Sequence, residues 1–441
     1  MITDALNPPR TGGAIQQLLD PVPREDFLSL YWERQPLFVS RESPGYFDDL
    51  FSLDDFDALI ARSDLWHPNV RVFLAGRQLS SGEFSTTWRY GREIHNRLID
   101  RSKLLDLIRQ GATVNLLGVE RTCSEISLLS RRLEQETGFP VHTTAFFTPP
   151  HAVNIPPHYD MVDVFVVQVS GTKEWGLWQP DRVLPLTTDT AGRIYQPGDG
   201  PVARERELGR YVLRPGDTLY VPRGVLHEAV TTDQTSLHLA VGVNVHRWHD
   251  VIRAVVEQAV AQLADVVEFR HALPAGYHNG GHTQQGSDTA RLMAAALART
   301  VRDGLDSGLA AIDKRYLHTR SASRPGHLED IDQLDGLDSS SWLVLRPGVV
   351  VGIAPHNGRI RVAFHQKALT VGSTLATALA FVTSGQPFTV AEIPGLQQGQ
   401  QLQFSRRLVA EGLLTIVQKR PQAEAPYTPN QPPTPVIDGH T

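Results

Sequence analysis

The chain has 441 residues, 41% of them hydrophobic and 20% charged, a composition typical of a globular protein with two or three domains. Its formal net charge of -6 argues against a general nucleic-acid binder and suits a basic protein or peptide as partner. The single cysteine, Cys123, cannot form an internal disulfide. This predicts a reducing, cytoplasmic compartment and a buried spectator thiol rather than a nucleophile.

The N-terminal part of the chain is expected to be mostly helical between residues 14 and 62. Ser52 and Asp55 have the spacing of a capping box at the start of a helix, and Phe56 and Leu59 follow at helical spacing. The first residues lack the basic stretch and apolar run of a signal peptide, and no apolar segment approaches the roughly 20 residues that span a bilayer. No membrane association is therefore expected.

The middle of the chain changes from mixed structure to a run of short strands. Residues 70–150 alternate between strand-like runs and one clear helix at 122–138, which ends at Gly138. From 140 to 246 the pattern consists of apolar strands separated by Pro and Gly turns, including two strands joined by the Pro-Gly-Asp turn in YVLRPGDTLYV. Several short strands at this spacing predict an antiparallel barrel or jelly roll.

The pattern returns to helix after Trp248. A loop at 271–287 is rich in Gly, His and Gln; its His278 and His282 have a spacing seen in metal sites, but no third ligand stands nearby, so a flexible loop is expected. Residues 316–340 have the composition of a linker.

The C-terminal region is expected to form a small α/β module at 341–420, in which two helices followed by a strand resemble a winged helix. Arg406 and Arg407 stand on the second of these helices, yet the small number of basic residues argues against a phosphate-binding face. The Pro-rich tail at 421–441 is expected to be disordered.

Three residues of the predicted barrel are candidate metal ligands. His158 and Asp160 stand two apart at the edge of a strand, where side chains at i and i+2 share one face. His227 follows a strand and a Pro-Arg-Gly turn, and in a small barrel that strand can run beside the first. A His-x-Asp pair alone is a weak signal among 17 histidines. Two imidazoles and one carboxylate on one face of an octahedron, however, are typical of non-haem iron oxygenases.

The runs NIPPHYDMVDVFVVQVSGTKEW, LRPGDTLYVPRGVLHEA and SLHLAVGV together resemble the JmjC-type cupin oxygenases. Within these, the chain is most similar to the ribosomal oxygenases, which hydroxylate protein side chains. YWERQPLFV and FSLDDFDALI resemble the N-terminal region of that family, and the resemblance extends to about residue 418.

The resemblance implies an α+β protein built on a double-stranded β-helix, the jelly-roll or cupin fold. The expected parts are an N-terminal α/β region at 1–110, the JmjC barrel at 111–246, a helical dimerisation domain with linker at 247–340, the winged-helix-like domain at 341–420 and the tail at 421–441. A homodimer is expected on the helices between about 248 and 312. Apolar stripes there comprise Val251, Val255, Leu263 and Val267 on one helix and Leu292, Ala295, Ala296 and Leu297 on the next.

The resemblance also implies the roles of individual site residues. His158, Asp160 and His227 would hold Fe(II), with 2-oxoglutarate and O2 as cosubstrates. Lys173 would pair with the far carboxylate of 2-oxoglutarate, and Thr144 would make a small polar contact to it. A dianion in a partly buried barrel does need a cation to offset its desolvation.

One position departs from the family pattern. The strand after the third ligand often ends in a serine near the cosubstrate, and Gly242 stands at the corresponding place, which puts that contact in doubt. Trp175 and Trp178 are both expected to pack the barrel, with one of them able to border the substrate channel.

The implied reaction is hydroxylation of an arginine or histidine side chain of a basic protein such as a ribosomal protein, coupled to decarboxylation of 2-oxoglutarate to succinate. Three alternatives stay open: demethylation by the same chemistry, hydroxylation of a biosynthetic peptide or other substrate, and a non-catalytic, metal-bearing cupin. The aspartate of His-x-Asp favours hydroxylation, because related demethylases more often have glutamate there. Lys173 argues against the non-catalytic cupin, since a closed structural metal site needs no cosubstrate anchor. A winged-helix DNA regulator is opposed by the acidic net charge.

Overall fold

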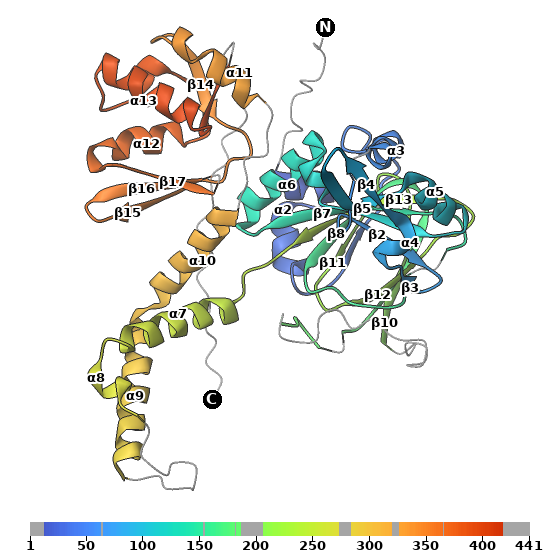
Figure 1. Cartoon of the computed structure of the whole chain (residues 1–441), viewed down its shortest axis with the longest axis horizontal. Coiled ribbons are helices and arrows are strands. Elements are labelled where there is room, and N and C mark those ends of the chain that lie inside the picture. Colours follow the sequence, from blue (N-terminus) through green and yellow to red (C-terminus); the bar gives the residue numbers. More distant parts are fainter. Residues whose placement is uncertain are drawn as a thin grey trace. The chain divides into compact units, whose positions relative to one another are not determined.

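The computed structural model describes residues 13–62, 65–152, 155–180, 182–186, 206–272, 284–319, 326–364 and 366–417. They form two compact units, with residues 13–319 in the larger and 326–417 in the smaller (Figure 1). Within the described residues, no helix combines the length and apolar character needed to cross a membrane.

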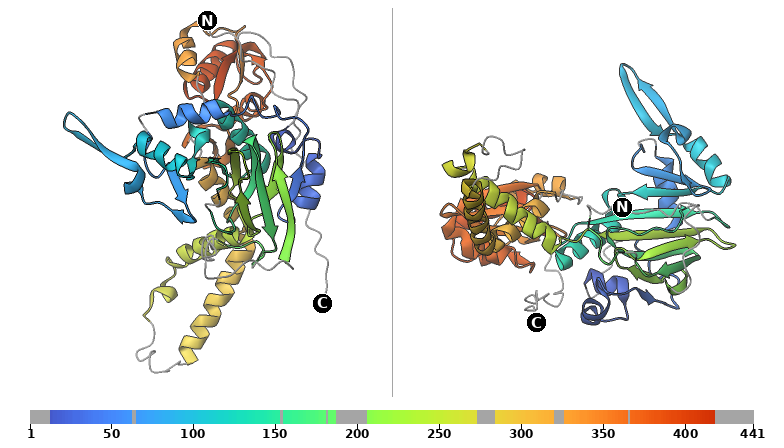
Figure 2. Two further views of the ribbon diagram at one scale, coloured as in Figure 1. Left: turned by 90° about the vertical axis from the view of Figure 1, so that its right-hand side faces the viewer. Right: turned by 90° about the horizontal axis from the view of Figure 1, so that it is seen from below.

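Two antiparallel sheets form the body of the larger unit. Eight strands lie in the order β1-β11-β8-β13-β7-β6-β2-β3, and three more in the order β10-β9-β12. A separate hairpin, β4–β5 (Ser85–Tyr90 and Glu93–Ile99), projects from this body (Figure 2). The sheet strands are β1 (Leu37–Val39), β2 (Val70–Leu74), β3 (Arg77–Gln78), β6 (Thr113–Leu117), β7 (Val141–Thr148), β8 (Asp163–Gly171), β9 (Lys173–Trp178), β10 (Glu207–Leu213), β11 (Thr218–Val221), β12 (Leu226–Val230) and β13 (Ser236–Val243).

Strand β8 is almost continuously apolar because both of its faces are covered. Phe165 and Val167 point into the main core, where they pack with the N-terminal helices. Val164 and Val166 point the other way, into a second cluster shared with the three-stranded sheet. Burial on both faces removes the alternation of apolar and polar residues that a half-exposed strand would show.

The strands on either side of the predicted Pro-Gly-Asp turn are present, but they belong to different sheets. β10 pairs with β9, whereas β11 pairs with β8 and β1. The turn therefore passes the chain from one sheet to the other, as a jelly roll requires. The pairing of β1 with β11 also means that the region expected to be mostly helical contributes an edge strand to the large sheet.

The N-terminal helices confirm two predicted helix ends. At the start of α3, Asp55 N donates to Ser52 Oγ over 3.1 Å and Ser52 N donates to Asp55 Oδ2 over 2.9 Å, which completes the capping box. Helix α6 ends at Gly138, whose φ of +72° is the left-handed conformation of a C-terminal cap. The helical segments of this region are α1 (Ala14–Leu19), α2 (Arg24–Asp26), the π-helix η1 (Phe27–Tyr31), α3 (Leu53–Ala61), α4 (Ser81–Phe84), α5 (Arg101–Arg109) and α6 (Ser124–Thr137).

Two glycine turns position the strands that carry the site. Gly171, the last residue of β8 before the turn to β9, has a φ of +63°, and a Cβ there would lie 1.6 Å from the Thr235 carbonyl oxygen. Gly224, before β12, has a φ of +86°, and a Cβ would lie 2.6 Å from a Pro185 ring atom. Neither turn accepts a side chain without moving backbone or a rigid ring.

The rest of the larger unit is helical: α7 (Trp248–Leu263), α8 (Val267–Arg270), α9 (Gln284–Asp303) and α10 (Leu305–Thr319). Helix α7 packs against both α9 and α10 (Figure 1). Val251 and Val255 are buried in this packing, where Gly308 of α10 lets α7 approach closely. The first predicted apolar stripe is thus used in part for packing within the chain.

The smaller unit has its own core, which includes Leu343, Leu379 and Leu408. Helix α11 lies inside the segment expected to be a linker, so that expectation is wrong there; its buried Asp330 accepts hydrogen bonds from Arg346 and from the backbone of Ile416. The predicted tail lies outside the described residues. The elements are α11 (His327–Asp332), β14 (Trp342–Leu345), β15 (Gly352–His356), β16 (Arg359–Phe364), β17 (Lys367–Gly372), α12 (Ala376–Val382), β18 (Phe388–Thr389), α13 (Gln398–Ala410) and β19 (Leu414–Val417), in two sheets ordered β18-β14-β19 and β15-β16-β17.

Candidate metal centre

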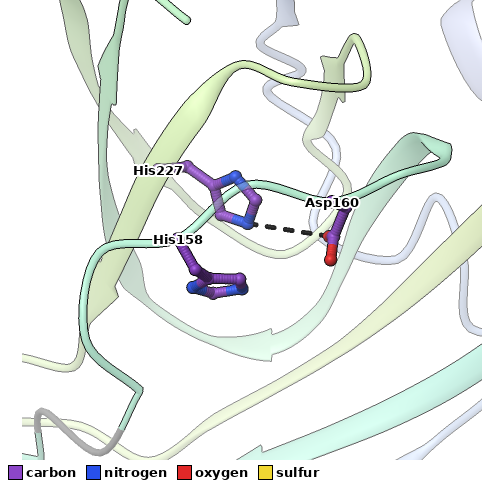
Figure 3. Close-up of side chains that lie close together, drawn as sticks. All are labelled: His158, Asp160 and His227. Carbon is purple, nitrogen blue, oxygen red and sulfur yellow. Dashed lines mark ion pairs between the residues drawn. The ribbon is translucent and has the colours of Figure 1, made fainter. Parts of the chain in front are cut away.

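The three predicted ligands converge at one point of the larger unit (Figure 3). His158 N donates to His227 O over 3.0 Å and His227 N donates to His158 O over 2.8 Å, so the backbone pairs the two histidines directly. Their ring centroids are 4.4 Å apart. Asp160 is held by its backbone carbonyl, which accepts from Gly224 N over 2.9 Å. The ligand atoms of all three side chains lie within 4.8 Å of one another.

Hydrogen bonds to the backbone orient both imidazoles. The Nδ1 atom of His158 lies 2.9 Å from Pro156 O, and that of His227 lies 3.0 Å from Val225 O. A carbonyl oxygen only accepts, so each Nδ1 carries the hydrogen and each Nε2 keeps a lone pair. His227 Nε2 is 3.7 Å from Asp160 Oδ2. This support of the non-ligating nitrogen is the usual outer shell of histidine metal ligands.

The protonation state of His227 also suits a metal. Burial, together with the neighbouring His158, lowers the pKa of His227 to about 4, so its imidazole is neutral at neutral pH. Neutral imidazole is the form that binds a metal ion. Two nitrogens and one carboxylate oxygen suit a divalent ion such as iron(II) with open positions left for other ligands. Within the described ranges, this is the one group of three such side chains close enough to hold an ion.

A cavity that is partly open to solvent extends from the triad into the space between the two sheets. The Asp160 side chain is 45% exposed at its mouth, whereas Lys173 is 5% exposed. The walls of the cavity are mostly apolar. The lining residues besides the triad are Thr113, Phe146, Thr148, Ile155, Val164, Val166, Lys173, Trp175, Val221, Ala229, His238 and Ala240.

Lys173 is the cation of this cavity. Its Nζ donates to Thr148 Oγ1 over 3.0 Å, and no acidic side chain pairs with it among the described residues. Burial lowers the pKa of Lys173 to about 7. A buried amine without a counter-charge is costly to ionise, and an anionic ligand would restore its charge. The chemistry of the cavity therefore suits a ligand that chelates a metal at one end and carries an anion at the other.

The predicted contact at Thr144 is not found in this cavity. Thr144 lies on the same face of β7 as Phe146 and Thr148, and is paired in register with Ala240, but it is not among the lining residues. Thr148, four residues later, takes the place beside Lys173 and is itself 3.2 Å from Thr113. The role of Thr144 stays a prediction.

Two residues that line the cavity were missed in the sequence. Thr148 is one, and His238 is the other. Gly242 packs against His142, since a Cβ there would lie 2.6 Å from His142 Cε1, and it does not line the cavity. His238 stands four residues earlier on the same face of β13 and does line it. Because side chains alternate along a strand, His238 and Gly242 lie on one face of β13. This alternation was the sequence signal that could have identified His238 as a cavity residue.

The remaining sequence features have structural roles or lie outside the described residues. Trp175 lines the cavity, whereas Trp178 is buried with the Arg210 guanidinium 5.8 Å from its ring centroid. Burial raises the pKa of the Cys123 thiol to about 11, which disfavours a thiolate nucleophile. His278 and His282 lie outside the described residues.

The two C-terminal arginines are both engaged within the smaller unit. Arg406 donates to the carbonyls of Asp335 and Leu337, and Arg407 pairs with Glu411 at 2.6 Å. Neither arginine is therefore left as a free cation on helix α13.

Comparisons with known proteins match part of the chain to a known domain family and most of it to named relatives. Residues 123–251 match the JmjC domain family. Bifunctional lysine-specific demethylase and histidyl-hydroxylase NO66 from Aedes aegypti is 27% identical over 321 residues, 68% of this chain and 47% of that protein. Ribosomal oxygenase 2 from Bos taurus is 26% identical over 370 residues, 80% of this chain and 75% of that protein. The chain thus spans about half the length of NO66 and most of ribosomal oxygenase 2.

The fold is also found in a solved structure. YcfD, a ribosomal oxygenase from Escherichia coli in complex with cobalt and 2-oxoglutarate, aligns over 90% of this chain and 98% of its own, with a TM-score of 0.51 and 17% identity. The JmjC ribosomal oxygenases are 2-oxoglutarate-dependent oxygenases, the class of enzyme predicted from the sequence. Residues 123–251 thus resemble the JmjC domain, the chain has the fold of YcfD, and it is similar in sequence to the ribosomal oxygenases.

Proposed function

We propose that this protein is an Fe(II)- and 2-oxoglutarate-dependent dioxygenase that hydroxylates an amino-acid side chain of a protein. The observation that carries the proposal is one cavity that has the three candidate metal ligands at its open end and a buried lysine further in. Among the described residues, no acidic side chain pairs with this lysine. When bound, iron supplies oxygen activation coupled to decarboxylation of 2-oxoglutarate.

The residues of the chain have separate tasks in this reaction. His158, Asp160 and His227 would hold the metal through two imidazole nitrogens and one carboxylate oxygen. Lys173 binds the far carboxylate and thereby fixes the direction in which 2-oxoglutarate lies. The apolar walls, among them Val164 and Val221, keep water away from the reacting atoms. A substrate side chain would enter past the exposed edge of Asp160.

Binding of 2-oxoglutarate should depend on pH through Lys173. The pKa of Lys173 is about 7 without a ligand, and a bound carboxylate would raise it, so the ligand binds the ammonium form. We expect the tightest binding below pH 7, with affinity falling by up to about tenfold per pH unit as the pH rises above 7. Calorimetric titration between pH 6 and 9 measures this. Lys173→Arg should flatten the profile, because a guanidinium stays charged throughout; an equally steep profile in that variant would remove Lys173 as its origin.

For the substrate, we propose an arginine or histidine side chain of a basic protein, such as a ribosomal protein. Two observations support this class. The relatives are named ribosomal oxygenases and a histidyl-hydroxylase, and the net charge of -6 attracts a basic partner. Association should weaken as salt rises, because surface charges are screened over about 8–10 Å near physiological ionic strength.

The substrate proposal is tested by intact-mass analysis of ribosomal proteins from cells with and without the gene. We expect one ribosomal protein to be heavier by one oxygen when the gene is present, and the purified, iron-loaded protein to restore that mass in vitro. Identical masses for every ribosomal protein would contradict the ribosomal assignment. A biosynthetic peptide would then become the leading substrate.

Demethylation is the second candidate function, because NO66 carries both activities in its name. The same mass analysis separates the two reactions, since demethylation removes a CH2 unit where hydroxylation adds an oxygen. Metal binding without any consumption of 2-oxoglutarate would favour the non-catalytic cupin.

We further propose that the protein is a homodimer built on helices α7 and α9. Val251 and Val255 pack internally, but Trp248 (68% exposed), Val260 (57%) and Leu292 (65%) are large apolar side chains that these helices leave exposed. Light scattering at micromolar concentration should give twice the chain mass of 48.8 kDa. Leu292→Glu should shift the protein toward monomer. A monomer mass for the unaltered protein would reject the dimer.

A further inference from the structure

The wall of the cavity beside Lys173 carries two buried polar atoms without a partner. His238 Nδ1 and Trp175 Nε1 are inaccessible to solvent, and neither has a hydrogen-bond partner among the described residues. Both side chains line the same cavity as Lys173. Buried polar atoms are nearly always hydrogen-bonded in native proteins. Two exceptions on one cavity wall therefore indicate a site whose partner is a ligand.

His238 is held firmly in this wall. It is 2% exposed, and its ring lies parallel to Phe146 with centroids 4.8 Å apart and 8° between the planes. Trp175 meets it edge-on at 5.5 Å and 82°. The Trp175 ring is also 5.9 Å from the ring of His227, so the indole forms the wall between the metal centre and His238. Two aromatic contacts fix the imidazole before any ligand arrives.

The charge around His238 selects an anionic partner. Burial, and then the neighbouring Lys173, lowers the pKa of His238 well below its usual range, so the imidazole is neutral and offers one N–H. Among the residues that the structure describes, Lys173 has Thr148 as its one hydrogen-bond partner. The ammonium, the imidazole and the indole together offer several donors. A carboxylate, with about four lone-pair sites, can accept from all three groups.

We propose that His238 binds the far carboxylate of the cosubstrate alongside Lys173, with the Trp175 indole as a further donor. The inference rests on the proposed function for the identity of the ligand. In the family that the sequence resembles, a serine on this strand often contacts the cosubstrate, and Gly242 stands at that position here. His238, on the same face of β13, would make the contact to the cosubstrate in this chain. A histidine reaches further into the cavity than a serine would, and its N–H adds a hydrogen bond without adding a second positive charge.

The test compares two ligands on the full-length protein loaded with Mn(II), by calorimetric titration. 2-Oxoglutarate has a far carboxylate, and 2-oxobutyrate has the same metal-chelating end without one. We expect His238→Leu, which keeps volume but no N–H, to weaken 2-oxoglutarate by about 10- to 100-fold, the usual worth of a hydrogen bond to a charged group. The same variant should bind 2-oxobutyrate as the unaltered protein does. His238→Asn, which keeps a donor, should recover most of the affinity, and Trp175→Phe should lose part of it.

The controls separate this inference from the proposed function. His249→Leu, on an exposed histidine of α7, should bind both ligands normally. Unchanged 2-oxobutyrate binding shows that a variant has kept its fold and metal centre. If His238→Leu binds 2-oxoglutarate normally while Lys173→Ala does not, the role of His238 is refuted and the proposed function stands. If the unaltered, metal-loaded protein does not bind 2-oxoglutarate, both are refuted.

Discussion

Replacing Asp160 with alanine should lower 2-oxoglutarate turnover by more than about 100-fold, a larger loss than removal of an outer-shell partner usually causes. Asp160 supplies the one carboxylate of the triad, and without it two neutral imidazoles remain. The fold should survive, because the side chain is 45% exposed and the structure relies on the Asp160 backbone carbonyl, which alanine keeps. Succinate production measures the first effect and thermal unfolding the second.

Asp233→Ala is the matched control for this substitution. Asp233 is an exposed aspartate in the loop between β12 and β13, outside the triad and the cavity. Its replacement should leave turnover unchanged. Full turnover in the Asp160→Ala protein would mean that the metal is held elsewhere.

Replacing Lys173 with alanine should raise the concentration of 2-oxoglutarate required by about 30- to 4,000-fold. The estimate corresponds to roughly 2–5 kcal/mol for the loss of one partner of a buried, hydrogen-bonded charge pair. Lys173 is 5% exposed, and among the described residues its hydrogen bond goes to Thr148 rather than to the triad, so metal affinity should change little. Titrations with 2-oxoglutarate and with the metal separate the two effects.

Lys173→Arg is the matched conservative variant. It keeps a cation in the same wall of the cavity, so it should lose less affinity for 2-oxoglutarate than Lys173→Ala. An alanine variant with unchanged affinity for 2-oxoglutarate would show that the carboxylate binds elsewhere in the cavity. A parallel loss of metal binding would instead point to a general collapse of the site.

The metal ligands were accessible to sequence reasoning because their signal is local. His158 and Asp160 share one strand edge at a spacing of two, and His227 follows a recognisable turn. The structure adds the reason that the third ligand meets the first two: His158 and His227 exchange two backbone hydrogen bonds, which places their rings side by side.

The far wall of the cavity was less accessible because it depends on strand register. Thr144 and Thr148 share a face of β7, as do His238 and Gly242 on β13, so alternation alone does not say which member of each pair reaches Lys173. The pairing of Thr144 with Ala240 and of Phe146 with His238 decides it. A shift of four residues along a strand moves a side chain by about 13 Å. The register of β7 and β13 relative to β9 depends on tertiary structure, so it could not be predicted from this sequence alone.

Edge pairing and short helices were hidden for a similar reason. Strand β1 has only three residues and gains its place by pairing with β11, far away in the chain. Helix α11 begins just after a Ser- and Arg-rich stretch, and it is stabilised by the buried pair of Asp330 and Arg346 rather than by an apolar stripe. Composition and periodicity both miss elements that long-range contacts hold in place.

The central claim is that one cavity binds iron through the triad and 2-oxoglutarate beside it. Anaerobic titration of the full-length protein with Fe(II) and 2-oxoglutarate, followed by visible absorption, tests it most directly, because chelation of Fe(II) by a 2-oxo acid gives a charge-transfer band. We predict a band that saturates at one equivalent of each per chain, is lost in His227→Ala, and needs a higher 2-oxoglutarate concentration in Lys173→Ala. A protein that binds Fe(II) but gives no band at any 2-oxoglutarate concentration, or an undiminished band in His227→Ala, would contradict the claim.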